Sequence, residues 1–301
     1  MKYFVAPGED RELTADSRKA LRGSFVELSD GVTHYELTGP EGGDVVLMAG
    51  GLTIPLFYWD GLVGELHARG LRTLTCSAYG RGYSDRVRAR YDETLFARQL
   101  AELTERLGLT GRPLHLVGTS MGALVAMTYA AQYRSSVSTL TIVGPAGLAK
   151  PRPASPDRLL RSDLLAGVVA RRRGLRLLQG HLGHNVRDPG LGAELTEMVL
   201  DCLRFEGSLY AVFDTLQHLP VTGRDDLFRQ TGALGIPTLL LWGDEDTVTP
   251  PVHFDTARAL LKSHSHHIIT QCGHMAPFER PHDVADHLVP FVSARTERLD
   301  P

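Results

Sequence analysis

A serine flanked by two glycines is the first candidate for chemistry in this sequence. Residues 118–122 read Gly-Thr-Ser-Met-Gly, after the apolar run 114–117 and before the helix-forming run 123–127. A short strand, a G-x-S-x-G turn and a helix in this order are typical of a nucleophile elbow, which makes Ser120 the candidate nucleophile. In so sharp a turn, a side chain at either glycine would collide with neighbouring backbone. The first free amides of the helix, including that of Met121, then face a developing oxyanion.

A base and an acid for this serine follow later in the chain. A serine hydroxyl is a poor nucleophile at neutral pH, so it needs a base that an acid orients and whose cation the acid stabilises. Asp246 comes just after the apolar run 239–242, and His274 comes just after the strand-like run 267–270. The chain order serine, acid, histidine, each at the end of a strand, predicts Ser120, Asp246 and His274 as a catalytic triad.

The acid has two alternatives in its own loop. Asp244 and Glu245 are carboxylates adjacent to Asp246. Asp246 also has a structural interpretation, as the cap of a helix that follows Pro250 and Pro251. Cys272 lies two residues before the histidine, but the elbow already supplies a nucleophile, so we expect no catalytic role for this thiol.

From about residue 24 to residue 288 the chain resembles a bacterial α/β-hydrolase of the esterase, lipase and C–C hydrolase superfamily. Beyond the three candidate residues, the resemblance rests on three segments: 52–60, 79–85 and 277–281. It implies a doubly wound, mostly parallel eight-stranded sheet with a helical cap inserted after strand 6. It also implies that the amides of Leu52 and Met121 form the oxyanion hole, and that substrate contacts Gly51, Thr53 and Trp59.

Two positions depart from the family pattern. Relatives usually carry His-Gly at the end of the third strand, where this chain has Gly50 and Gly51; an alignment shifted by one would make Gly51 rather than Leu52 the oxyanion donor. Relatives also usually have an aspartate near Ser77. Both changes remove a polar group near the site. We expect the missing side chain at Gly50 to leave space beside the nucleophile for a bulkier acyl group.

Periodicity and turn residues predict the elements that position these groups. We expect an N-terminal arm over 1–23, loose or with a short helix, a hydrolase core over 24–147 and 233–301, and a helical cap over 148–232. Strands are predicted at 25–28, 33–37, 45–48, 72–76, 114–117, 140–143, 239–242 and 267–270. Helical spacing occurs at 62–71, 95–107, 191–205 and 209–219.

The cap holds further candidates with two interpretations each. Residues 150–187 contain nine basic residues and two acidic ones, a local net charge of +7. This segment is either a solvated face or a surface that attracts an anionic substrate or an acyl carrier protein. His181 and His184 are candidates for lining the substrate pocket. Neither they nor the His264, His266 and His267 cluster has the further ligands that a metal site requires, so we expect no metal.

Composition excludes several classes of protein. The chain has 301 residues, 43% hydrophobic and 22% charged, with a formal net charge of −3, so we expect a folded protein that does not bind nucleic acid. No apolar run approaches the roughly 20 residues that span a bilayer, and the first ten residues lack the apolar region of a signal peptide. Three cysteines without a CxxC pair favour a reduced, cytoplasmic protein. No cofactor is expected, and oligomeric state stays open.

Three functions fit these residues. The leading hypothesis is a serine hydrolase that cleaves an ester, thioester or lactone of a small, largely apolar acyl group through an acyl-enzyme on Ser120. The alternatives are a C–C bond hydrolase of a diketone, and a biosynthetic acyltransferase or cyclase that uses the same triad. Arginine outnumbers lysine by 28 to 4, which is typical of GC-rich bacterial genomes, in which hydrolases of specialised metabolism are common.

Overall fold

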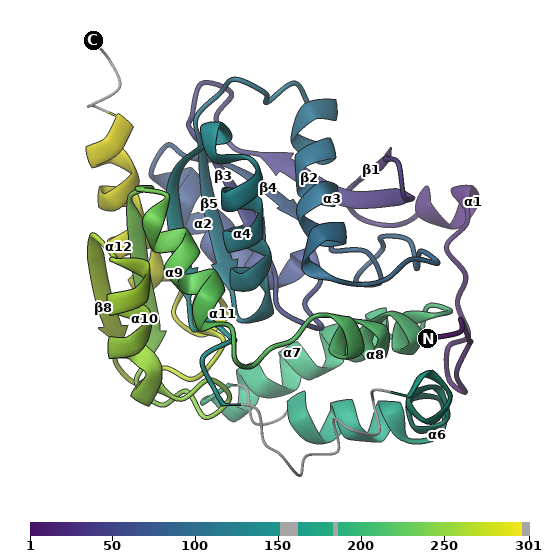
Figure 1. The fold of residues 1–301 in the computed structure, drawn as a ribbon. Coiled ribbons are helices and arrows are strands. Elements are labelled where there is room, and N and C mark those ends of the chain that lie inside the picture. The colour runs from purple at the N-terminus through teal and green to yellow at the C-terminus, as the bar shows by residue number, and fades with distance from the viewer. Residues whose placement is uncertain (151–161, 183–185, 297–301) are drawn as a thin grey trace.

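An eight-stranded sheet forms the centre of the protein. The computed structural model describes residues 1–150, 162–182 and 186–296 (Figure 1). The strand order is β1-β2-β4-β3-β5-β6-β7-β8; β2 pairs antiparallel with β1 and β4, and the other neighbours pair parallel. The strands are β1 (Ser24–Glu27), β2 (Val32–Thr38), β3 (Val45–Ala49), β4 (Arg72–Cys76), β5 (Leu114–Thr119), β6 (Val137–Val143), β7 (Thr238–Gly243) and β8 (Ser265–Ile269). The predicted fold class is therefore confirmed. The predicted strands end and begin within two residues of the observed ones, except that β6 begins three residues before the predicted range 140–143.

Helices cover both faces of this sheet. One group packs in a row, α3 (Glu93–Arg106), α4 (Met121–Gln132), α9 (Asp225–Ala233) and α10 (Phe254–Leu261). The other group is α2 (Asp60–Ala68), α11 (Ala276–Glu279) and α12 (Pro281–Thr296). Right-handed crossovers between parallel strands put the two groups on opposite faces (Figure 1). Every residue of β3, β5 and β7 is buried, which explains why these strands read as continuous apolar runs.

The connection from β6 to β7 contains the predicted helical insert. Helices α6 (Asp163–Leu182), α7 (Pro189–Cys202) and α8 (Ser208–His218) lie together below the sheet in Figure 1. Helix α9 falls inside the cap range 148–232, yet it packs against α4 and α10 of the core. We therefore propose that the core resumes at α9 and that the cap ends before it.

The N-terminal segment is held against the insert. Arg11 forms a β-bridge with Phe205, and its amide donates to the Arg204 carbonyl at 3.0 Å. Phe4 and Glu9 are buried, with 5% and 7% of their surface exposed. A four-residue helix, α1 (Ala15–Arg18), then leads to β1. Because buried side chains and a β-bridge attach it, this segment is a packed arm with a short helix rather than a loose one.

Three short 3-10 turns lie in the connections of the described chain. They are η1 (Leu56–Trp59), η2 (Arg134–Ser136) and η3 (Pro251–His253). The first follows the loop after β3, and the third follows the loop after β7. Along the part of the chain that the structure describes, no helix is both long and apolar enough to cross a membrane.

Candidate active site

Ser120 occupies a strained turn between β5 and α4. Its backbone has φ 55° and ψ −121°. This conformation is energetically unfavourable for any residue other than glycine. Neighbouring backbone holds the turn in place: the Ser120 amide donates to the Val143 carbonyl at 3.1 Å, and the Ser120 carbonyl accepts from the Ala146 amide at 3.2 Å. Strain of this kind persists only where the surrounding structure enforces it, as at a nucleophile elbow.

The two glycines that flank this turn allow three backbone segments to meet. A Cβ at Gly118 would lie 2.6 Å from the Gly122 carbonyl oxygen. A Cβ at Gly122 would lie 2.1 Å from the Ala49 carbonyl oxygen at the end of β3. No real Cβ tolerates such distances, so both positions require glycine, as the sequence predicts.

The structure brings Ser120, His274 and Asp246 into one hydrogen-bonded row. His274 Nε2 lies 2.9 Å from Ser120 Oγ, and His274 Nδ1 lies 2.8 Å from Asp246 Oδ2. The residues come from the loops that follow β5, β7 and β8, so the carboxyl ends of three parallel strands position them. Asp246 accepts the Nδ1 proton, which leaves Nε2 free to accept the serine proton.

Asp246 is the carboxylate of its loop that contacts the histidine. It is 3% exposed, and its Oδ1 accepts the amides of Val248 at 2.9 Å and Thr249 at 2.8 Å. Asp244 is exposed and accepts the Cys272 amide at 3.1 Å instead. Glu245 is also exposed and pairs with Arg187 at 2.8 Å. The geometry thus favours Asp246 over both neighbouring alternatives.

The loop after β3 passes directly beside the nucleophile. A Cβ built on Gly51 would lie 3.4 Å from Ser120 Cβ and 3.8 Å from Ser120 Oγ. The amide of Leu52 follows immediately, and Met121 begins α4, whose first amides have no partner within the helix. Leu52 and Met121 therefore remain our proposed oxyanion donors, and Gly51 and Thr53 remain the proposed substrate contacts of this loop.

Ser77 keeps a polar function where relatives have an aspartate. Its hydroxyl accepts the Leu56 amide at 3.1 Å and lies 3.2 Å from His34 Nδ1. Burial lowers the pKa of His34 to about 4, and its Nε2 lies 2.8 Å from the Arg22 carbonyl oxygen. A neutral His34 that donates from Nε2 therefore accepts the Ser77 proton at Nδ1. The serine and the histidine together hold the start of η1 in place without a carboxylate.

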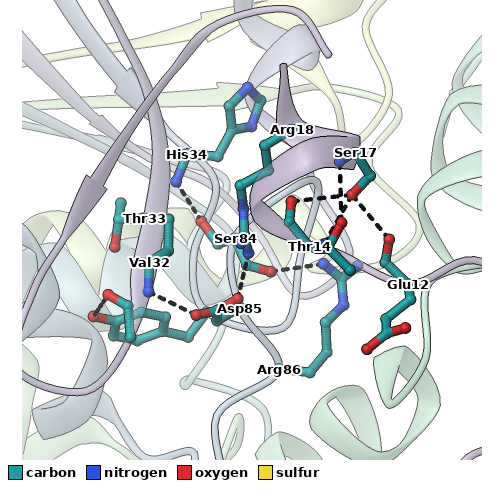
Figure 2. Close-up of polar contacts among 12 residues, drawn as sticks. Glu12, Thr14, Ser17, Arg18, Val32, Thr33, His34, Ser84, Asp85 and Arg86 are labelled. Carbon is teal, nitrogen blue, oxygen red and sulfur yellow. Dashed lines mark hydrogen bonds and ion pairs between the residues drawn. The ribbon is translucent and has the colours of Figure 1, made fainter. Parts of the chain in front are cut away.

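The network around His34 extends to the N-terminal arm. Figure 2 shows the His34 amide donating to Ser84 Oγ and the Val32 amide donating to Asp85, at 2.9 and 2.7 Å. Arg18 of α1 forms an ion pair with the same Asp85 (Figure 2). These contacts fix the loop after β4 against β2 and α1.

The space left by Gly50 is small. It belongs to an interior cavity of about 20 Å³ whose lining includes Cys76, Ala78 and Met121. A Cβ at Gly50 would already lie 3.2 Å from Ile54 Cβ. A cavity of this size accommodates a single water molecule. Ile54 thus borders the position of a side chain at residue 50, and the expectation that Gly50 makes room for a bulkier acyl group stays a prediction.

Other candidates lie away from the hydrogen-bonded row. Trp59 is fully buried and packs edge-on against Tyr58, with ring centroids 4.9 Å apart, so it offers no surface to substrate as the site stands. His181 belongs to α6, but its side chain is not among the described residues, and His184 lies outside them. Burial raises the pKa of the Cys272 thiol, which disfavours a thiolate nucleophile.

Two further sets of predictions concern charge and metals. On α6, Arg171, Arg172, Arg173 and Arg176 are exposed, whereas Arg152, Arg158 and Arg161 lie outside the described residues. Within the ranges that the structure describes, no group of three or more His, Cys, Asp or Glu side chains is placed to hold a metal ion. His267 instead stacks on His287, with ring centroids 3.9 Å apart.

The sequence analysis did not identify Thr249, whose hydroxyl contacts the acid, the histidine and a neighbouring backbone carbonyl. Its hydroxyl lies 2.8 Å from Asp246 Oδ2, 3.2 Å from His274 Nδ1 and 3.1 Å from the Gly144 carbonyl oxygen. A threonine three residues after a candidate acid is typical of a loop that folds back on the carboxylate, and this spacing is the signal that the sequence offered.

Comparison with known proteins agrees with this fold. A profile of the alpha/beta hydrolase fold family matches residues 44–281. Among curated proteins, monoacylglycerol lipase abhd6-B of Xenopus laevis is 28% identical over 217 residues, which cover 65% of this chain and 60% of the relative. Human monoacylglycerol lipase ABHD6 is 25% identical over 220 residues, with the same coverage of each chain. The match thus spans less than two thirds of the length of these relatives.

Solved structures show the same architecture. An esterase from Thermogutta terrifontis superposes with a TM-score of 0.76 at 23% identity, covering 90% of this chain and 99% of the esterase. A bacterial membrane phospholipase A superposes with a TM-score of 0.72 at 26% identity, covering 93% of this chain and 88% of the phospholipase.

Proposed function

Since the chain belongs to the alpha/beta hydrolase fold family, we propose that it is a serine hydrolase that cleaves a carboxylic ester. The observation that carries this proposal is the continuous row of hydrogen bonds from Ser120 Oγ through His274 to Asp246. At 2.9 and 2.8 Å, both links lie within the distance over which a histidine takes a proton from a serine and an acid orients that histidine.

The proposed reaction proceeds in two steps on Ser120. Ser120 Oγ attacks the ester carbonyl carbon while His274 Nε2 takes the hydroxyl proton, and the amides of Leu52 and Met121 stabilise the oxyanion. The tetrahedral intermediate collapses, and the leaving alcohol receives the proton from His274. A water molecule then attacks the acyl-enzyme with His274 again as the base, which releases the carboxylic acid and restores Ser120.

We propose a monoester of a largely apolar acyl group as the substrate class. The curated relatives named above are monoacylglycerol lipases, and the solved structures named above include an esterase and a phospholipase. Each of these names describes the cleavage of an ester bond. Thioesters and lactones are attacked at the same acyl carbon and release a thiol and a tethered hydroxyl in place of a free alcohol, so they fall within the proposal as variants of the substrate.

An active-site label tests the proposal directly. A fluorophosphonate probe phosphonylates a serine that an adjacent base activates, so we expect peptide mapping to find one label, on Ser120. Ser120→Ala should remove both the label and the hydrolysis of p-nitrophenyl butyrate, while Ser135→Ala, an exposed serine in η2, should keep both. A label on another residue, or full hydrolysis by a folded Ser120→Ala variant, would contradict the assignment.

A further inference from the structure

Arg81 is a buried cation that contacts the proposed oxyanion loop, which we define as residues 50–54. The residue lies in the connection between β4 and α3 and is 2% exposed. Its Nε donates to the Leu52 carbonyl oxygen at 2.7 Å. The loop carbonyl that follows the proposed oxyanion donor is thus held by a side chain from another part of the sheet edge.

The same guanidinium also reaches the insert. Arg81 Nη2 donates to Thr215 Oγ1 of α8 at 2.8 Å, and Nη1 donates to the Tyr79 carbonyl oxygen at 3.0 Å. The group lies near two aromatic rings, with its carbon 5.9 Å from the Tyr91 centroid and 5.3 Å from the Phe96 centroid. One rigid planar group therefore joins the loop after β3, the loop after β4 and helix α8.

Because the Arg81 guanidinium is buried, its hydrogen bonds determine where it lies. Burial lowers the pKa of Arg81 to about 10, so the side chain still carries its charge at neutral pH. A buried charge is tolerated only where hydrogen-bond acceptors replace water. The three oxygen acceptors thus constrain the guanidinium, and a shift of any of them changes the hydrogen bonds that the other two receive.

The Leu52 amide depends on how its own loop is held. The Gly51 carbonyl accepts the Ile54 amide at 3.4 Å, and the Leu52 carbonyl accepts from Arg81 at 2.7 Å. In a trans peptide the N–H points away from the carbonyl of the same unit, so the bond to the Gly51 carbonyl orients the Leu52 amide. The Leu52 carbonyl that Arg81 holds belongs to the next unit, so Arg81 fixes the peptide plane that meets the plane of the Leu52 amide at the Leu52 Cα. A small misplacement of an oxyanion donor lowers the rate strongly.

We propose that Arg81 is a positioning residue that couples helix α8 of the insert to the oxyanion loop. The expected effect on kcat rests on the proposed function. The structural coupling between α8 and the loop does not depend on it. Arg81 does not touch the reacting atoms; it acts by holding the Leu52 carbonyl, with Thr215 as the contact through which the position of α8 reaches the loop.

Arg86 provides a matched control on the same connection. It also bonds the insert, since its Nη2 donates to Ser208 Oγ at 2.9 Å and to the Cys202 carbonyl oxygen at 3.1 Å. Its Nε also donates to Ser208 Oγ at 3.0 Å, and its Nη1 donates to the carbonyls of Gly82 and Ser84. Figure 2 shows the contact with Ser84. Burial lowers the pKa of Arg86 to about 10 as well. A change at Arg86 thus removes a buried cation and a contact to α8, but none of its bonds above involves the oxyanion loop.

The experiment compares Arg81→Met, Thr215→Val and Arg86→Met in the full chain. For each variant we measure kcat and KM on p-nitrophenyl butyrate, the thermal unfolding midpoint, and hydrogen–deuterium exchange of the peptide that covers residues 50–54. Because loss of a whole oxyanion donor costs about 10²- to 10³-fold in kcat, we expect a displaced donor in Arg81→Met to cost about 10- to 100-fold, with KM changed less than about threefold. Thr215→Val should give a smaller loss of the same kind.

Exchange separates the coupling from the enzymatic proposal. Faster exchange over 50–54 in Arg81→Met and Thr215→Val, but not in Arg86→Met, supports the coupling even for a protein that hydrolyses no ester. The coupling would be overturned if Arg81→Met and Arg86→Met lost kcat equally and each loss followed the decrease in the unfolding midpoint. Unchanged exchange over 50–54 in Thr215→Val would also overturn it, and that conservative variant preserves the fold even where Arg81→Met does not.

Discussion

Thr249 binds both carboxylate oxygens of Asp246. Its amide donates to Oδ1 at 2.8 Å, and its hydroxyl lies 2.8 Å from Oδ2, the oxygen that also accepts from His274. The carboxylate is therefore fixed in rotation before it meets the imidazole. A carboxylate with both oxygens engaged presents one lone pair to His274 Nδ1, which determines the orientation of the ring and leaves Nε2 facing Ser120.

The first prediction concerns the acid itself. Asp246→Asn should lower kcat by about 10³- to 10⁴-fold, because an amide does not stabilise the imidazolium and permits the wrong tautomer. Asp244→Asn serves as the matched control from the same loop, since Asp244 contacts the Cys272 amide rather than the histidine. Steady-state kinetics on an activated ester measure both. The reverse order of the two losses would show that Asp244 is the acid.

The second prediction concerns the Thr249 hydroxyl. Thr249→Val keeps the amide bond to Asp246 Oδ1 and removes the hydroxyl with its contacts to Asp246 Oδ2, His274 Nδ1 and the Gly144 carbonyl. We expect kcat to fall by about 10-fold, which corresponds to the lower limit for one hydrogen bond to a charged group. Thr238→Val, at the opposite end of β7, removes a hydroxyl bond to the Ile236 carbonyl and is the control. Equal kcat losses in the two variants would mean that Thr249 affects general stability alone.

The third prediction concerns space beside the nucleophile. Gly51→Ala would place a methyl group 3.4 Å from Ser120 Cβ without contact to backbone of another segment. The protein should fold normally, while kcat/KM for bulky aryl esters falls by about 10- to 100-fold and that for acetate falls less. Gly42→Ala meets nothing within 4 Å and is the control. A uniform loss across acetate, butyrate and aryl esters would instead indicate a displaced oxyanion donor.

The fourth prediction concerns acid stability through His34. The folded protein keeps this histidine neutral down to a pKa of about 4, whereas an unfolded histidine takes up a proton below its ordinary value of 6.5. The unfolded state therefore binds more protons between these values, so the free energy of unfolding falls as the pH falls through that window, by on the order of 3 kcal/mol for this residue.

Urea unfolding at several pH values between 7.5 and 4.5 measures this dependence. His34→Asn should be less stable at pH 7.5 and should lose less of its remaining stability on acidification. A slope remains in that variant because burial also lowers the pKa of His115 to about 4. His253→Asn, the same change at a half-buried position in η3, is the control for the substitution itself. A His34→Asn variant with an unchanged slope would show that the proton uptake occurs elsewhere.

The fifth prediction concerns the packed arm. Glu9 is buried, and its carboxylate accepts the amides of Ala6 at 2.7 Å, Gly207 at 2.9 Å and Leu209 at 2.7 Å, at the start of α8. Glu9→Gln replaces one oxygen with a donor that faces amide donors, so we expect a loss of about 1–3 kcal/mol. Thermal unfolding measures it, with the exposed Glu12→Gln as control. Equal midpoints in the two variants would mean that the arm does not stabilise the insert.

The sequence by itself determined the elements and the chain order of the candidate site. Apolar runs such as 114–117 and 239–242 predict buried strands because a parallel strand is covered on both faces and every position along it must be apolar. The glycines at 118 and 122 predict a tight turn because a G-x-S-x-G pattern between an apolar run and a helix-forming run is typical of a sharp strand-to-helix turn. Such inferences depend on residues close in sequence, so they hold before the tertiary structure is known.

Only the tertiary structure decided which groups meet. The sequence offers three carboxylates between residues 244 and 246, and the course of that loop brings one of them to His274. The sequence does not say what lies beside Gly50, and the fold places Ile54 there, 3.2 Å from where a Cβ would be. The partner of Arg81 on α8 is Thr215, which lies 134 residues away in sequence. Contacts of this kind depend on how distant segments pack around the sheet, and no local pattern in the chain records that packing.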